Sequence, residues 1–433
     1  MSGYRTVFAA SRWRRQAFGA AFLSAGALMA ASVAAAELGE NVQGLLELAR
    51  AQSPELATMR AEADAAAQRV QPAGALPDPV LRVEMMNVNN YGSNAGINLL
   101  PSKVGETKYT LMQQLPWSGK LGLKRDVASA DARQAQARTA AAWTELAMRI
   151  KTAYASYWLA AGNERITREI LDLLARVEQI AQARYAGGLV QQQDAIRAQL
   201  EQTTLRSELI ALQSERRQQQ ARLNALLARD AGAPLAPPQV LRPVPAIGPL
   251  DAPALRQRTQ ANNPQLQAED ARVAAAEKSR QLTYRNRYPD FNVGLAPSQM
   301  GTRLTTWGVM MEVNIPLQQT TRRSQEAEAE TMVTAARARV QNAATQLDGD
   351  LGQALAGLQA ARQTEELAIG QSLPQSELSL RSAIASYENG KLDFTALLEA
   401  QRQIRKVRQD RLKAQAEAQM RLAEVEKIVG EDL

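Results

Sequence analysis

Tyr185-Ala186-Gly187-Gly188 and Tyr387-Glu388-Asn389-Gly390 each interrupt a long run of helix-forming residues. Glycine adopts the left-handed conformation that often follows the last turn of a helix, so each stretch predicts a tight turn between two helices. The two stretches lie roughly 200 residues apart, which is the offset of a large internal repeat. The sequence therefore predicts two helical hairpins in a duplicated chain.

Further segments repeat at the same offset and in the same order. They are Ser53-Pro54-Glu55-Leu56 with Asn263-Pro264-Gln265-Leu266, Leu76-Pro77-Asp78 with Tyr288-Pro289-Asp290, and Gln114-Leu115-Pro116 with Asn314-Ile315-Pro316. Each half is predicted to run short helix, strand, loop, strand, long helix, turn, long helix. The predicted fold class is mostly α with a small β part.

The predicted hairpins lie in regions almost free of proline. None occurs between Pro116 and Pro234, and only Pro374 follows Pro316. Apolar residues spaced alternately by four and three indicate a coiled-coil seam, at Ile166, Ile170, Leu173, Val177 and Ile180. A helix over residues 121–185 would be on the order of 100 Å long.

Four segments alternate apolar and polar residues and are predicted strands, at about 79–88, 108–115, 290–296 and 305–315. Such alternation suits a wall between lipid and water, and it suits a half-buried soluble sheet equally well. Four strands are too few to close a membrane barrel, whereas three chains would supply twelve.

The chain is expected to divide into four parts. Residues 1–36 are predicted to be a signal peptide, since Arg12, Arg14 and Arg15 precede an apolar run and Ala34-Ala35-Ala36 offers a cleavage site. An N-terminal membrane anchor is the alternative. The other parts are a first repeat at 37–229 with a hairpin at 118–229, a proline-rich linker at 230–253, and a second repeat at 254–433 with a hairpin at 318–429.

The composition excludes most enzyme chemistries. The chain has no Cys and no His, hence no thiol nucleophile, no imidazole base and no usual zinc site. We expect no enzyme activity, no cofactor and no bound metal, and interpret Asp348-Gly349-Asp350 as ion-pairing residues of a helix. The net charge of +7 falls to about +3 without the first 36 residues, so no nucleic-acid partner is expected.

These motifs together resemble the TolC-type outer-membrane efflux factors. The resemblance rests on the ordered duplication, on Ala75-Leu76-Pro77-Asp78-Pro79 before the first strand and on Gln114-Leu115-Pro116-Trp117-Ser118-Gly119-Lys120 after the second. It implies a homotrimer with a twelve-stranded β-barrel in the lipid of the outer membrane of a Gram-negative bacterium, joined to a long α-helical coiled-coil barrel in the periplasm. Such a trimer is a passive exit duct that docks to a periplasmic adaptor and an inner-membrane transporter.

The resemblance also assigns roles to the hairpin turns. It implies that Gly188, Leu189, Val190, Gly390, Leu392 and Phe394 form adaptor-docking tips, with Arg381 and Ile384 at the periplasmic entrance. The alternative is that these residues only cap the end of the helical barrel. Residues 381–387 contain no acid, so the acidic ring that closes some family members is not expected here.

The cargo and pump stay open at this point. Tyr387-Glu388-Asn389-Gly390-Lys391-Leu392-Asp393-Phe394 is most similar to the heavy-metal branch, which works with resistance-nodulation-division pumps. Methionines on or beside the strands could line a soft-metal path or simply fill lipid-facing surface, at Met85, Met86, Met112, Met300, Met310 and Met311. The alternatives are a drug-efflux or type I secretion channel with an ABC transporter, and a periplasmic coiled-coil adaptor.

Overall fold

The computed structural model describes residues 38–88, 97, 99–188, 191–245 and 250–433. All the helices and strands described lie in the compact unit Glu37–Leu433. The expected signal peptide, part of the linker, Leu189 and Val190 lie outside the described residues.

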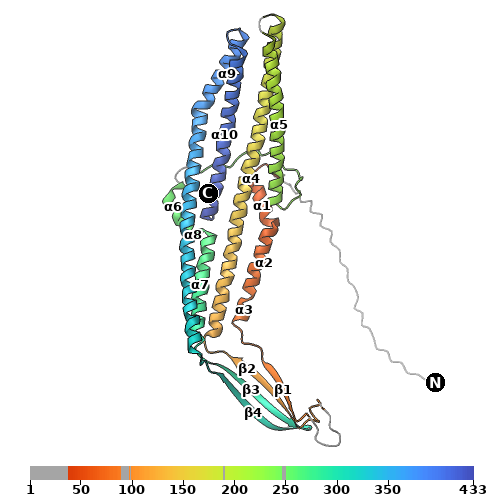
Figure 1. The fold of residues 1–433 in the computed structure, drawn as a ribbon, viewed down its shortest axis with the longest axis vertical. Coiled ribbons are helices and arrows are strands. Elements are labelled where there is room, and N and C mark those ends of the chain that lie inside the picture. The colour runs from red at the N-terminus through yellow and green to blue at the C-terminus, as the bar shows by residue number, and fades with distance from the viewer. Residues whose placement is uncertain (1–37, 89–96, 98, 189–190, 246–249) are drawn as a thin grey trace, which may run out of the picture. The chain divides into compact units, whose positions relative to one another are not determined.

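The two halves of the chain have matching element orders (Figure 1). The first half contains α1 Val42–Gln52, α2 Pro54–Gln68, α3 Val70–Ala73, β1 Val80–Met86, β2 Glu106–Leu115, α4 Lys120–Ala186 and α5 Gln192–Leu226. The second contains α6 Ala252–Asn262, α7 Pro264–Arg285, β3 Asp290–Met300, β4 Arg303–Asn314, α8 Gln319–Leu367, the π-helix η2 Ala368–Ser372, α9 Leu373–Glu388 and α10 Phe394–Val429. The mostly helical duplicated fold is therefore confirmed.

The repeated Ser-Pro and Asn-Pro segments begin equivalent helices. The Ser53 hydroxyl accepts a hydrogen bond from the Leu56 N–H at 3.4 Å, and the Asn263 side chain accepts one from the Leu266 N–H at 3.0 Å. The proline that follows each cap occupies the first turn, where its missing N–H costs nothing. The same rule explains why α6 begins at Ala252, inside the expected linker, since Pro253 lies in its first turn.

The four strands form one antiparallel sheet in the order β1-β2-β3-β4. The β2–β3 pairing joins the two halves of the chain, with Leu111 opposite Leu295. Strand β3 extends past its expected end at 296 through Pro297 to Met300, because a register shift at Ser298/Gln299 accommodates the proline there. Strand β2 begins at Glu106, two residues before the expected start.

Helix α4 is the central helix of the bundle, packing against α2, α5, α7 and α10. Both hairpin turns lie at the same end of the helices, and the sheet lies at the other end (Figure 1). The seam on α4 runs through Ile166, Ile170, Leu174, Val177 and Ala181, whereas the expected Leu173 and Ile180 are only half-buried. The reason is that α4 packs against α5 and α10 together rather than against one partner.

The first helix of the second hairpin is not continuous, unlike its counterpart α4. Five π-helical residues at 368–372 separate α8 from α9, and Pro374 lies in the first turn of α9. A proline inside a helix offers no N–H to the preceding turn and its ring crowds that carbonyl, which a π-bulge relieves. The first helix of the second hairpin is thus interrupted just before Pro374.

A buried ion-pair cluster joins α4, α10 and the linker. Lys151 Nζ lies 2.7 Å from Glu426 Oε2, and Arg242 Nη1 lies 2.9 Å from Glu426 Oε1. Lys151 also pairs with Asp432. Because Lys151 and Glu426 are both buried, loss of one partner would leave the other charge uncompensated. The cluster thereby fixes the C-terminal end of α10 to the middle of the bundle.

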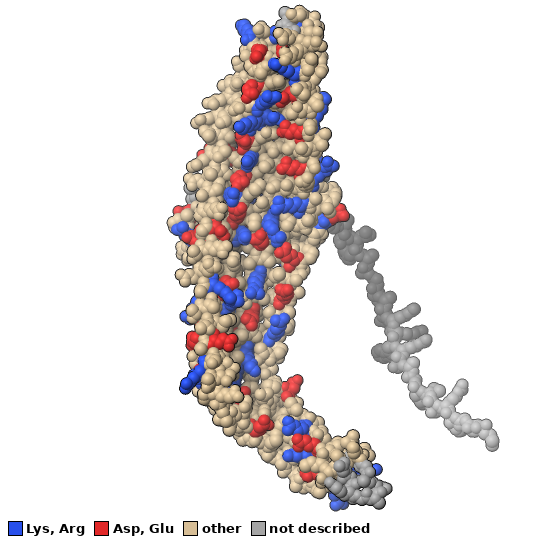
Figure 2. Space-filling model, viewed as in Figure 1, with Lys and Arg blue, Asp and Glu red and all other residues tan. Residues whose placement is uncertain are grey.

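Acidic and basic side chains are interspersed along the helices on the face shown in Figure 2. This mixture agrees with the small excess of positive charge in the sequence. Among the described helices, none combines the length and the apolar character needed to cross a membrane.

Candidate functional site

The two hairpin tips have the backbone that their glycines predict. Gly188 has a φ of +70° and Gly390 a φ of +72°. The N–H of Gly188 donates to the Tyr185 carbonyl at 2.9 Å, and the N–H of Lys391 donates to the Ser386 carbonyl at 2.9 Å. These bonds satisfy carbonyls left free at the ends of α4 and α9, so each helix ends two residues before its left-handed glycine.

Arg184 links the first tip to the second. Its guanidinium carbon lies 5.1 Å from the centroid of the Tyr387 ring, and its Nη1 donates to the Tyr387 carbonyl. A Cβ at Gly390 would lie 2.9 Å from Arg184 Nη2, so glycine leaves the room that this guanidinium occupies. Sequence reasoning missed this residue because no local pattern predicts a contact between hairpins.

The structure corrects the expected role of Phe394. Its side chain is only 1% exposed and packs edge-on against Tyr387, with ring centroids 5.5 Å apart. Both rings belong to an apolar cluster with Val177 and Leu397 beneath the tips. The Phe394 side chain is therefore part of the packing beneath the tips and is not exposed on the surface where docking was expected, because the start of α10 places it against Tyr387 of α9.

The surface of the tips consists of other residues. Gly188 and Gly390 are exposed, and Leu392 is half-buried against the same apolar cluster. Tyr185 is 47% exposed, although Tyr387 occupies the equivalent place in the repeat and is buried. The repeat does not distinguish the two tyrosines, so the exposure of Tyr185 could not be predicted from it. The expected tip residues Leu189 and Val190 lie outside the described residues.

Charged groups are close together between the tips. Arg197 Nη1 donates to the Thr395 hydroxyl at 2.6 Å, and Asp393 caps α10 by accepting from the Ala396 N–H at 2.9 Å. Burial raises the pKa of Asp194 above its ordinary value, and the Asp393 carboxylate adds to this against the opposite effect of Arg197. The tip region thus holds a carboxylate that is easier to protonate than usual.

The two residues expected at the entrance lie in different environments. Arg381 is exposed, and among the described residues of this chain it has no acidic partner. Ile384 is half-buried against the apolar cluster beneath the tips. The structure of one chain thus leaves Arg381 free to face a neighbouring molecule, whereas Ile384 contributes mainly to packing.

A series of ion pairs joins α10 to the first hairpin below the tips. Arg402 pairs with Glu201 at 2.6 Å, and Arg408 pairs with Glu169 at 3.3 Å. Arg405 pairs with Glu208 between them. Most of these groups are partly exposed, so each pair contributes little alone, but the series sets how the hairpins align.

The sheet carries the second candidate surface, an exposed apolar face. The register aligns Leu81, Leu111, Leu295 and Val309 in one row across all four strands, and each is between 52% and 79% exposed. Neighbouring rows on this face contain Trp307 and Met311, which are also exposed. Large apolar side chains that would normally be buried in a core are thus exposed on this face of the sheet. Such a surface usually contacts lipid or another protein.

The opposite face of the sheet is more polar, although it also contains methionines. It holds Arg82, Glu84, Thr110, Ser298 and Glu312, and Gly294 and Gly308 lie among them. The methionines are divided between the two faces, with Met311 on the apolar face and Met112 and Met310 in one row on the polar face. The structure therefore does not gather them into one path.

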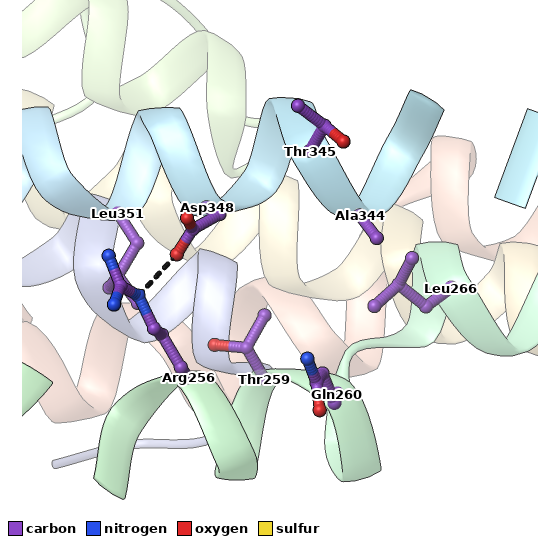
Figure 3. A pocket seen from close by; sticks show the side chains of 8 residues that line it. All are labelled: Arg256, Thr259, Gln260, Leu266, Ala344, Thr345, Asp348 and Leu351. Atoms are coloured by element: carbon purple, nitrogen blue, oxygen red, sulfur yellow. Dashed lines mark hydrogen bonds and ion pairs between the residues drawn. The ribbon is translucent and has the colours of Figure 1, made fainter. Parts of the chain in front are cut away.

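A hollow lies between α6 and α8 (Figure 3). Its lining includes Thr259, Leu266 and Thr345, and Arg256 pairs across it with Asp348. The Thr259 hydroxyl donates to the Leu255 carbonyl at 2.9 Å. Asp348 thus forms an ion pair, but with an arginine of a neighbouring helix and not with a residue one turn away on α8.

The comparisons with known proteins agree with this geometry. The sequence model of a family described as outer membrane efflux protein matches residues 45–229 and 255–431, which are most of the chain. None of the curated proteins matches the chain by sequence.

Solved structures share the fold at low sequence identity. One of these structures is CusC, reported for the conformational changes that accompany its folding and transmembrane channel formation. It is 15% identical to this chain with a TM-score of 0.76, over 90% of this chain and 92% of that chain. VceC, an outer membrane protein of Vibrio cholerae, is 17% identical with a TM-score of 0.74, over 90% and 96%. The CmeC outer membrane channel of Campylobacter jejuni is 14% identical with a TM-score of 0.75, over 90% and 86%.

Proposed function

Because this chain belongs to the outer membrane efflux protein family, we propose that three copies assemble into the exit duct of a tripartite efflux pump. Families of this kind are channels and not enzymes. The alternative of a periplasmic adaptor is wrong, since the family match spans both halves of the chain.

The apolar face of the sheet is the observation that carries the proposal. In the four-stranded sheet, β1 and β4 are the outer strands, and each pairs with a strand on one side. Unpaired strand edges are not tolerated in lipid, so the sheet must continue into other copies. Three copies would close it with the apolar rows toward lipid and the polar face toward water.

Paired cysteines test this assembly directly, because the chain has no cysteine of its own. In a closed ring, β1 of one copy lies antiparallel to β4 of the next. Val83→Cys combined in turn with Trp307→Cys, Val309→Cys and Met311→Cys should give oxidised dimers and trimers for at least one pair. Each single-cysteine variant is the matched control. A set with no cross-linked product, or a protein recovered from the soluble periplasm, would contradict the proposal.

The duct is proposed to conduct passively, with the hairpin tips as its periplasmic entrance and as the surface for an adaptor. The exposed Tyr185 and the half-buried Leu392 are the described apolar residues best placed for docking. Tyr185→Ser should weaken capture of the purified adaptor and leave trimer yield unchanged. Val240→Ser removes another exposed apolar side chain away from the tips and serves as the control. Equal effects of the two changes would refute the docking role.

The inner-membrane partner is proposed to be a resistance-nodulation-division pump, and an ABC exporter is the alternative. Export of soft-metal cations is the more specific candidate, but the division of methionines between both sheet faces favours packing and lipid contact for them. Replacing Met112 and Met310 together by leucine tests the difference. Unchanged metal resistance would remove the strand methionines from the cargo path.

A further inference from the structure

Four arginines lie together where the helices meet the sheet. Arg285 is the last residue of α7, Arg287 lies in the turn that follows it, and Arg322 and Arg323 are near the beginning of α8. Arg322 Nη1 donates to the Asn286 carbonyl, which holds the start of α8 against the end of α7. We call these four residues the junction arginines.

The junction arginines carry more charge than their surroundings balance. Glu326 pairs with Arg287, and hydrogen bonding from Arg287 together with the fields of Arg322 and Arg323 lowers the pKa of Glu326. Among the described residues, Arg285 and Arg323 have no ion pair, although Arg285 lies 5.8 Å from the centroid of the Tyr288 ring. The cluster of four cations and one carboxylate therefore has a net charge of +3.

Folding of the helices does not account for this charge. The N-terminus of a helix is the positive end of its dipole, so two arginines near the start of α8 are in an unfavourable place. Residues that break a local rule without a structural gain often serve a binding function. The excess of cations at this junction thus points to an anionic ligand.

The junction adjoins the apolar face of the sheet. Tyr288 is 44% exposed and stacks on Trp117, with ring centroids 5.0 Å apart. Ile315 and Leu317, which continue from the end of β4 toward Arg322, are 65% and 79% exposed. From the sheet toward the helices, the exposed side chains are thus first apolar, then aromatic and then cationic. Membrane proteins have the same order across the boundary between hydrocarbon and headgroups.

The height of the apolar face agrees with this boundary. Exposed apolar residues on β4 run from Leu304 to Val313, which is about 30 Å of strand at roughly 3.3 Å per residue. A strand tilted by about 40° covers about 23 Å of membrane depth over that length, close to the roughly 25 Å apolar band of outer-membrane sheets. The junction arginines then lie at headgroup level on the side of the helices.

We propose that the junction arginines bind the phosphate groups of anionic phospholipids at the periplasmic surface of the membrane. The inference rests on the proposed function, because it requires the sheet to span that membrane. Arg285 and Arg323 supply cations that have no acidic partner among the described residues, and guanidinium groups form paired hydrogen bonds with phosphate oxygens. Tyr288 and Leu317 set the depth at which the arginines meet the headgroups.

Lipid binding to the purified trimer tests the proposal. Phosphatidylglycerol and phosphatidylcholine are titrated separately at low salt, and native mass spectrometry gives the ratio of their dissociation constants. The test variant is Arg285→Gln/Arg323→Gln. The control is Arg272→Gln/Arg339→Gln, which removes the same charge from the same two helices roughly 20 Å farther from the sheet.

The wild type and the control should prefer phosphatidylglycerol, and the test variant should lose about 30-fold of that preference. An unchanged preference in the test variant, or an equal loss in the control, would overturn the proposal. The proposal would also be overturned if the test variant lost the trimer but kept the lipid preference, since the arginines would then serve contacts between copies.

Two further measurements test the identity of the ligand and the proposed duct function separately. Soluble glycerol phosphate should bind far more weakly than the lipid, and equal affinity would overturn the assignment to a headgroup. Conductance of the wild type in a planar bilayer reports on the proposed function itself. A conducting wild type without preference for phosphatidylglycerol refutes only the lipid site, whereas a wild type that neither inserts nor conducts refutes the duct.

Discussion

Gly390→Ala should loosen the hairpin tips more than Gly188→Ala does. Both glycines have a left-handed backbone, which costs a residue with a Cβ about 1 kcal/mol. A Cβ at Gly188 would meet nothing within 4 Å, so this strain is the whole effect there. A Cβ at Gly390 would also displace the Arg184 guanidinium, which lies at the end of a flexible side chain and can move away.

Moving Arg184 has a cost of its own. Its contact with the Tyr387 ring contributes about 0.5–1 kcal/mol and its hydrogen bond to the Tyr387 carbonyl about 1 kcal/mol. Gly390→Ala should therefore lower the free energy of local opening by about 2–3 kcal/mol, against about 1 kcal/mol for Gly188→Ala. Both changes are smaller than the free energy of unfolding of a typical protein, so the variants should still fold.

Amide hydrogen exchange measures local opening in the assembled protein. Amides near the tips should exchange faster in both variants, and about tenfold faster in Gly390→Ala than in Gly188→Ala. In an Arg184→Met background the difference between the two alanine variants should largely disappear. Equal effects in the wild-type background, or a difference that survives without Arg184, would refute the proposed link between the tips.

Three further changes test other parts of the structure. Val309→Arg should lower insertion into bilayers at a cost of about 2–4 kcal/mol, whereas Thr306→Arg on the opposite sheet face should not, and equal insertion would mean that the faces are reversed. Lys151→Met should destabilise the protein by about 3 kcal/mol, because the buried Glu426 carboxylate would then keep only the half-buried Arg242 as a cationic partner; an unchanged unfolding midpoint would mean that the cluster has no structural role. Burial and a neighbouring carboxylate raise the pKa of Asp194, so the folded tip binds a proton more tightly than the unfolded chain does. Tip opening measured by hydrogen exchange should become harder as pH falls from neutral toward that raised pKa, and Asp194→Asn should remove this dependence; a pH profile that persists in the variant would assign it to another group.

Local features could be predicted because neighbouring residues determine them. Gly188 and Gly390 predict the ends of helices through their backbone conformation. The N-caps Ser53 and Asn263, each followed by a proline, begin helices in both halves. Alternation along the strands predicts the two sheet faces, since successive side chains point to opposite sides. The duplicated order of these signals was enough to indicate the family fold.

Only the tertiary structure decided which of these residues meet. Periodicity along one helix does not say which of two neighbours it faces, so the burial of Phe394 and the contact of Arg184 with the second tip could not be predicted. The π-bulge before Pro374 depends on how a whole helix accommodates one missing N–H. The pairing of Leu111 with Leu295, which joins the two halves into one sheet, is a contact between residues far apart in the chain, and no short-range rule specifies it.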